Sequence, residues 1–164
     1  MSAEVRIREL GPGRYDVLDA VVEGLSPTSR YHRFHTPAPR PTPQVREALA
    51  AVDGRSHIAV AAFTPDGTPV GIARLIAVGD GQSELAVEVV DEWQGRGVGG
   101  RLVRDVVERG RAAGHRAVRA AVLAENVAAQ ALFFAVFPAA IALPAAHEIG
   151  FAAELARDGA LCAA

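Results

Sequence analysis

The most informative stretch of the sequence is a glycine-rich block between a predicted strand and a predicted helix: Gln94-Gly95-Arg96-Gly97-Val98-Gly99-Gly100. Glycine loses more conformational entropy on folding than other residues, so such a block indicates a place where the backbone must approach a ligand closely. The helix that follows adds unpaired N–H groups and the positive end of its dipole. The block is therefore suited to bind a phosphate or pyrophosphate, and nearby arginines add positive charge: Arg96, Arg101 and Arg104.

Two nucleotide-binding folds use similar glycine patterns. The block contains GxGxxG, but in dinucleotide-binding folds the glycines follow the strand directly, whereas here residues 91–94 intervene. Only 39 residues follow Glu125, the acidic residue that could contact a ribose, and they are too few to complete a doubly wound sheet. The GxxxxGK[ST] loop is excluded because all 17 basic residues are Arg.

Gln94, Gly97 and Gly99 resemble the Q/R-x-x-G-x-G/A acyl-CoA signature of the GNAT superfamily of N-acetyltransferases. The resemblance covers about residues 4–135. It includes the strand of residues 83–90 and an element typical of the family, a strand followed by an Asn and a helix: Ala124-Glu125-Asn126 with Ala129 and Leu132. More narrowly, several segments look like the catalytic domain of bacterial protein-lysine acetyltransferases: Tyr31-His32-Arg33-Phe34, Val52-Asp53, Gly71-Ile72-Ala73-Arg74 and the strand that contains Glu84.

The resemblance implies an N-acetyltransferase that uses acetyl-CoA as co-substrate, without a metal, and transfers the acetyl group to a primary amine by direct attack in a ternary complex. It also implies how the cofactor is bound. The pyrophosphate would be held by the backbone amides of the glycine-rich block: Gln94, Gly95, Arg96, Gly97, Val98, Gly99 and Gly100. The pantetheine arm would pair with Val89 and Val90 at the end of the preceding strand, and Asn126 would contact the cofactor from the next strand–helix junction. One of the two valine amides could polarise the thioester carbonyl. Asn126 is equally compatible with a helix N-cap.

The acceptor amine must lose a proton before it attacks. For an amine of pKa about 10.4, deprotonation at pH 7 costs roughly 4.6 kcal/mol. Glu84 is the first candidate base, in a position that resembles the catalytic Glu of protein-lysine acetyltransferases, and Glu88 is the second. Both lie on one strand face, where they could raise each other's pKa or form a solvated surface. His57 is a weaker candidate, more typical of a structural His.

The acceptor is expected to be a protein lysine, by resemblance only. The alternatives are a small amine and a non-catalytic acyl-CoA-binding sensor. The sensor stays open because Phe133 stands where many family members have a proton-donating Tyr, and because the segment of residues 137–146 is longer and more apolar than the usual turn there. That segment normally helps to shape the acceptor pocket. Three aromatic side chains lie close together in the sequence: Tyr31, His32 and His35. They either line the acceptor side of the active site or pack against one another.

The periodicity of apolar residues predicts an α+β domain. Strands are predicted over residues 4–9, 57–63, 70–78, 83–90 and 118–123, with a final hairpin of 147–155 and 160–163. Helices are predicted over 14–24, 43–52, the stretch from the glycine block to Gly114, and 126–134. The resemblance adds a mixed, mostly antiparallel GNAT-like sheet of six or seven strands flanked by about four helices. We expect one domain over residues 1–164.

The composition of the chain excludes or disfavours several classes of binding partner. The 17 basic and 19 acidic residues give a net charge of −2, which disfavours a nucleic-acid partner. The single cysteine, Cys162, excludes an internal disulfide and a multi-cysteine zinc site. The longest apolar stretch, residues 131–146, contains two prolines and is shorter than the about 20 residues that a membrane span requires. The charged start is unlike a signal peptide, so we expect a cytoplasmic monomer or homodimer without a membrane partner.

Overall fold

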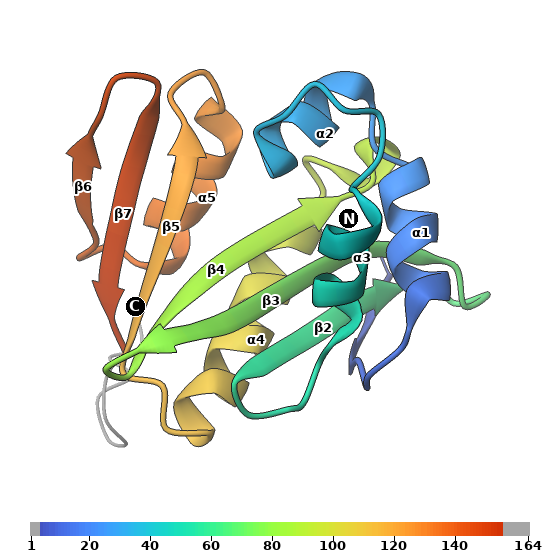
Figure 1. The fold of residues 1–164 in the computed structure, drawn as a ribbon, viewed down its shortest axis with the longest axis horizontal. Helices are drawn as coiled ribbons and strands as arrows, with labels where there is room; N and C mark the ends of the chain where they lie inside the picture. The colour runs from blue at the N-terminus through green and yellow to red at the C-terminus, as the bar shows by residue number, and fades with distance from the viewer. Residues whose placement is uncertain (1–3, 156–164) are drawn as a thin grey trace.

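A seven-stranded sheet runs through the molecule in the order β1-β2-β3-β4-β5-β7-β6 (Figure 1). The structure is a computed structural model and describes residues 4–155. Neighbouring strands are antiparallel except β4 and β5, which are parallel. The strands are β1 (Arg6–Glu9), β2 (His57–Phe63), β3 (Pro69–Gly79), β4 (Gln82–Val89), β5 (Ala117–Leu123), β6 (Ile141–Pro144) and β7 (Glu148–Glu154). The predicted mixed, mostly antiparallel sheet is thereby confirmed.

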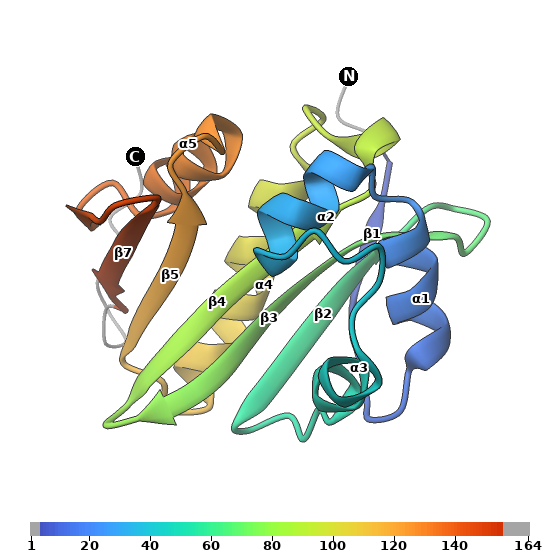
Figure 2. The same ribbon diagram turned by 45° about the horizontal axis from the view of Figure 1, so that its top comes forward.

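Five α-helices cover the two faces of the sheet in the described part of the chain, one more than expected. Helices α1–α3 pack on one face and α4 and α5 on the other (Figures 1 and 2). Their bounds are α1 (Tyr15–Glu23), α2 (Pro27–Phe34), α3 (Pro43–Ala50), α4 (Val98–Ala112) and α5 (Val127–Val136). No helix within residues 4–155 combines the length and the apolar character that crossing a bilayer requires.

The additional helix is α2, in a segment that the apolar pattern left as a short polar-aromatic stretch. Its signals are local. The Ser26 side chain accepts a hydrogen bond from Ser29 N, and Pro27 occupies the first turn, where its missing N–H costs nothing. The helix ends at Phe34, and the next residue, His35, has a left-handed backbone with φ 55°. No α2 side chain is buried, so the helix lacks the apolar stripe on which a sequence-based prediction depends.

The apolar core lies on both faces of the sheet because side chains alternate along each strand. On the α4 face, Leu75 and Leu85 pack with Leu102 and Val106 of α4. On the α1 face, Ile72 packs with Val17 and Val21, among others. Residues 84, 86 and 88 of β4 therefore point to the face that carries α1–α3.

The C-terminal hairpin differs from the prediction. Strand β7 forms where residues 147–155 were predicted, but it pairs with β5 and with β6, which lies in the apolar segment 137–146. The other predicted strand, residues 160–163 with Cys162, lies outside the described residues. β6 becomes an edge strand, and its Ile141 and Leu143 side chains are 63% and 65% exposed.

Candidate active site

The two parallel strands at the centre of the sheet separate along their length. β4 and β5 pair only at Gln82–Glu84 and Ala117–Arg119, and beyond these residues the strands diverge (Figure 1). The gap forms a cleft of about 780 Å³ that is lined from both faces of the sheet. The lining includes β4 residues 84–89, part of the glycine block, most of the length of α5 and one side of α2.

Backbone groups of β4 face this gap. The Val90 amide donates to Val70 O at 2.9 Å, and hydrogen bonds to the neighbouring strand alternate along an antiparallel ladder. The N–H and C=O groups of Val89 and Val87 therefore point away from β3. In agreement, Gln94 Nε2 donates to Val89 O at 2.9 Å. The amides of Val87 and Val89 are available to an extended ligand, whereas that of Val90, one of the two expected contacts, is occupied.

The glycine block forms a tight turn that ends at the N-terminus of α4. Gly95 and Gly97 have φ of 69° and 80°, in the left-handed region that favours glycine. The first helical hydrogen bond runs from Arg101 N to Gly97 O, so the amides of residues 98–100 have no acceptor within the helix. A Cβ at Gly95 or Gly97 would have no neighbour within 4 Å. The turn thus presents an open surface of free amides, as expected for an anion site.

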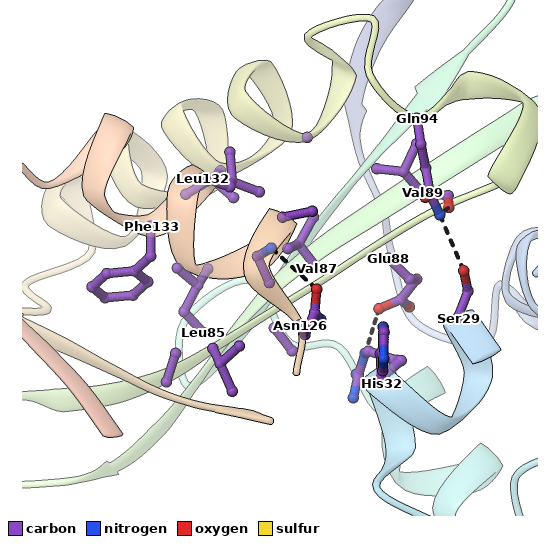
Figure 3. Close-up of a pocket in the computed structure, with 18 of the residues that line it drawn as sticks. Ser29, His32, Leu85, Val87, Glu88, Val89, Gln94, Asn126, Leu132 and Phe133 are labelled. Carbon is purple, nitrogen blue, oxygen red and sulfur yellow. Dashed lines mark hydrogen bonds and ion pairs between the residues drawn. The ribbon is translucent and has the colours of Figure 1, made fainter. Parts of the chain in front are cut away.

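The polar side chains around the turn have different roles. Gln94 uses its amide within the turn, where it donates to Asp91 O, and its side chain ties the turn to β4 and to Ser29 of α2 (Figure 3). Its backbone N–H is therefore not free for a ligand, contrary to expectation. Arg101 donates to Val5 O, and Arg96 stacks on Trp93. The Arg104 guanidinium lies beside Gly100, where a Cβ would be 2.9 Å from its Nη1.

Asn126, just before α5, and Phe133 of α5 both line the cleft. Asn126 Oδ1 accepts a hydrogen bond from Ala129 N at 3.2 Å, so Asn126 is an N-cap, the interpretation that was left open. Its side chain also borders the cleft (Figure 3). Phe133 is buried and packs against Phe137 and Phe151, with ring centroids 4.8 and 4.9 Å away. A phenyl ring has no proton to donate to a leaving group.

The two candidate bases on β4 lie in different environments although they share a strand face. Glu84 is exposed at the narrow end of the cleft. The Glu88 side chain is 1% exposed, and its carboxylate bonds Arg33 Nε at 2.5 Å and Arg74 Nη2 at 3.2 Å. Burial favours the neutral acid, but the two guanidinium groups prevail and hold the pKa of Glu88 below its ordinary value. The expected mutual increase of pKa is therefore wrong for Glu88.

The partners of Glu88 come from two of the four segments that resembled protein-lysine acetyltransferases. Arg33 belongs to α2, and Arg74 lies in the middle of β3, where it also donates to Leu49 O of α3. We did not predict this cluster, but an Arg inside the apolar run of residues 70–78 is a signal for a buried partner. His57 is outside the cleft lining, and burial, then Arg74, lowers its pKa. Within residues 4–155, no three His, Cys, Asp or Glu side chains are arranged to hold a metal.

The fold and the cleft agree with the sequence motif, and comparison with known proteins identifies the class. The profile of the Acetyltransferase (GNAT) family matches residues 19–135, which is more than two thirds of the chain. The protein therefore belongs to the GNAT acetyltransferases. Acetyl-CoA is the co-substrate of this family, as the sequence motif implied.

Three individual proteins are similar to this chain. Acetyltransferase PA5475 of Pseudomonas aeruginosa is 33% identical over 99 residues, which are 58% of this chain and 53% of that protein, so the match spans about half of its length. The GNAT domain of S. lividans PAT superposes with a TM-score of 0.83 at 23% identity, over 92% of this chain and 90% of that one. A Sinorhizobium meliloti phosphinothricin acetyltransferase in complex with AcCoA gives 0.72 at 16% identity, over 94% and 89%. These two likenesses concern the fold.

Proposed function

We propose that this protein is an acetyl-CoA-dependent N-acetyltransferase that modifies the side-chain amine of a protein lysine, with Glu84 as the general base. The observation that carries the proposal is the cleft where β4 and β5 diverge, because free amides border it on the α4 face and a carboxylate on the other. The protein acceptor rests on the segments that resemble protein-lysine acetyltransferases, and two of these contain Arg33 and Arg74. The two arginines meet at Glu88 beside the cleft.

The described residues fit acetyl-CoA. The amides of residues 98–100 and the Arg104 guanidinium would hold the pyrophosphate, and Val87 and Val89 would pair with the pantetheine arm as an added strand. Asn126 would contact the arm from the α5 side. When bound, acetyl-CoA supplies a thioester carbonyl and a thiolate leaving group. The Val89 amide, free and fixed by the ladder, would donate to that carbonyl and polarise it.

Glu84 has the properties that an amine acceptor requires. Its carboxylate is exposed at the cleft, so it can take a proton from the ammonium directly or through one water and return it to solvent. Glu88 has the opposite properties, because two guanidinium groups already occupy its carboxylate oxygens. We assign Glu88 a positioning role. Because Phe133 cannot donate a proton, water in the open cleft would protonate the thiolate.

The proposal is tested by measuring thiol release from acetyl-CoA with free amines, lysine peptides and proteins. We expect Glu84→Gln to lower kcat about 100-fold at pH 7, a usual contribution of a general base. The loss should shrink toward pH 10, where the free amine forms without help. A matched control is Glu154→Gln, which neutralises an exposed carboxylate on β7 outside the cleft lining and should keep the wild-type rate.

Three results would contradict parts of this proposal. An unchanged pH–rate profile for Glu84→Gln would remove Glu84 from the role of base. Turnover confined to small amines would replace the protein acceptor by a small molecule. CoA binding without turnover on any amine would favour the sensor function that the Phe133 substitution left open.

A further inference from the structure

Helix α2 is attached to the rest of the molecule mainly by polar contacts. None of its side chains is fully buried, but Phe34, its last residue, packs partly buried against the core on the α1 face. The helix lies over the end of β4 (Figure 2), and several of its side chains line the cleft. The Arg30 side chain donates to Val22 O and Pro39 O, and Ser29 Oγ accepts from Gln94. Apart from Phe34, which lies next to Arg33, these contacts are polar, so the edge of α2 away from Phe34 can separate from its support without exposing the core.

On the β4 side the attachment is buried. Arg33 Nε and Glu88 Oε2 are 2.5 Å apart, and their side chains are 16% and 1% exposed. Glu88 in turn binds Arg74, whose side chain is 2% exposed. Separating Arg33 from this cluster would leave a buried carboxylate with one guanidinium fewer, which is strongly unfavourable. This edge of α2 is therefore the fixed one.

On the other side, two histidine–carboxylate contacts join α2 to the far half of the molecule. His35 Nδ1 lies 2.7 Å from Glu148 Oε1, at the start of β7, and His32 Nε2 lies 3.5 Å from Glu125 Oε1, just before α5. Both contacts cross the region where β4 and β5 have diverged. The two glutamates are 43% and 64% exposed, so each contact competes with water and contributes little.

The two edges of α2 are thus held differently, one by a buried ion pair and the other by two exposed contacts. We propose that α2 is a gate over the acceptor side of the cleft: it pivots about Arg33–Glu88, and the contacts His35–Glu148 and His32–Glu125 hold its far edge closed. The inference rests on the proposed function, because the gate controls which amines reach Glu84. A lysine on a protein needs the far edge open, whereas a small amine passes with the gate closed. His32 and His35 with their glutamates are thus specificity-determining residues.

Hydrogen exchange of the α2 amides tests the gate without any turnover. The double variant Glu125→Ala/Glu148→Ala removes both contacts and leaves the sequence of α2, and hence its intrinsic exchange rates, unchanged. We expect about fivefold faster exchange in residues 30–34, the gain from losing two exposed histidine–carboxylate contacts. The exchange of β3 should stay as in the wild type.

Two further variants complete the exchange experiment. His32→Ala/His35→Asn breaks the same contacts from the other side, and Asn tolerates the left-handed backbone at position 35. Glu108→Gln is the matched control, because it breaks an exposed ion pair on α4, on the opposite face of the sheet. Unchanged α2 exchange in both double variants, or equal acceleration in Glu108→Gln, would overturn the gate.

Kinetics then separate the gate from the proposed function. In Glu125→Ala/Glu148→Ala, we expect KM for a lysine-bearing protein to fall severalfold, with KM for a small amine and the Kd of CoA unchanged. Equal changes of KM for both acceptors would contradict a size-selective gate. If no amine is acetylated by the wild type, the proposed function fails, and the exchange result alone decides whether α2 opens.

Discussion

At the scale of single residues, environment separates two carboxylates that the sequence could not distinguish. Glu84 and Glu88 lie four positions apart on one face of β4. Because side chains alternate between the two faces of a strand, the sequence pattern gives both residues the same predicted environment. Only Glu88 lies beneath α2 and beside Arg74 of the neighbouring strand. The same residue type is therefore available for proton transfer at one position and held ionised in a buried ion cluster at the other.

The buried cluster has a measurable consequence for stability. Glu88→Gln should lower the free energy of unfolding by about 3–5 kcal/mol, because it leaves two guanidinium groups without their carboxylate. Urea unfolding followed by circular dichroism measures the loss. Glu84→Gln is the matched comparison on the same strand face and should unfold as the wild type does. Equal stability of the two variants would show that the Glu88 contacts do not act as described.

His57 makes the stability depend on pH. Burial and the charge of Arg74 lower its pKa from the ordinary 6.5, so the folded state binds this proton less readily than the unfolded chain does. The charges around it are Arg74, which repels the imidazolium, and Asp53, which attracts it. Protonation therefore favours unfolding, and the contribution of His57 to stability is lost as pH falls below about 6.5.

We expect the decrease in stability from pH 7 to pH 5 to be smaller in His57→Gln than in the wild type. Urea midpoints at several pH values provide the measurement. His147→Gln, which removes an exposed imidazole, should keep the wild-type pH dependence. A wild-type slope in His57→Gln would assign the acid sensitivity to other groups.

At the scale of elements, the glycine turn and α4 act as one unit. Gly99 is the second residue of α4, and a Cβ there would lie 3.2 Å from Leu132 Cδ2, the mobile end of a side chain that can move aside. A larger residue at this position therefore does not require unfolding. It would stand among the free amides that are proposed to hold the pyrophosphate.

Gly99→Glu should weaken CoA binding more than tenfold, because a carboxylate would face a diphosphate at the end of α4. Calorimetric titration gives the affinity, and circular dichroism confirms the fold. Gly99→Ala adds the Cβ without the charge, so it should bind CoA more tightly than Gly99→Glu. Wild-type affinity of Gly99→Glu would place the pyrophosphate elsewhere.

Elements also differ in how far sequence patterns could predict them. Strands β2–β4 and helix α4 carry strong apolar periodicity and short turns, and they appear within one or two residues of the predicted bounds. α2 was missed because its signals are a cap and a proline rather than an apolar stripe. β6 was missed because residues 141–144 are apolar yet exposed, which a burial pattern does not predict.

At the scale of the whole molecule, the amino-acid sequence determined the class of fold, the glycine turn and the acetyl-CoA family, because each depends on short-range patterns of apolar residues, glycines and turns. Only the tertiary structure decided where β4 and β5 separate, which valine amide is free, and which glutamate meets two arginines. These features join residues up to 55 positions apart, from Arg33 to Glu88. The interactions that stabilise these features depend on burial and on charge pairing, and both arise only when the elements pack together.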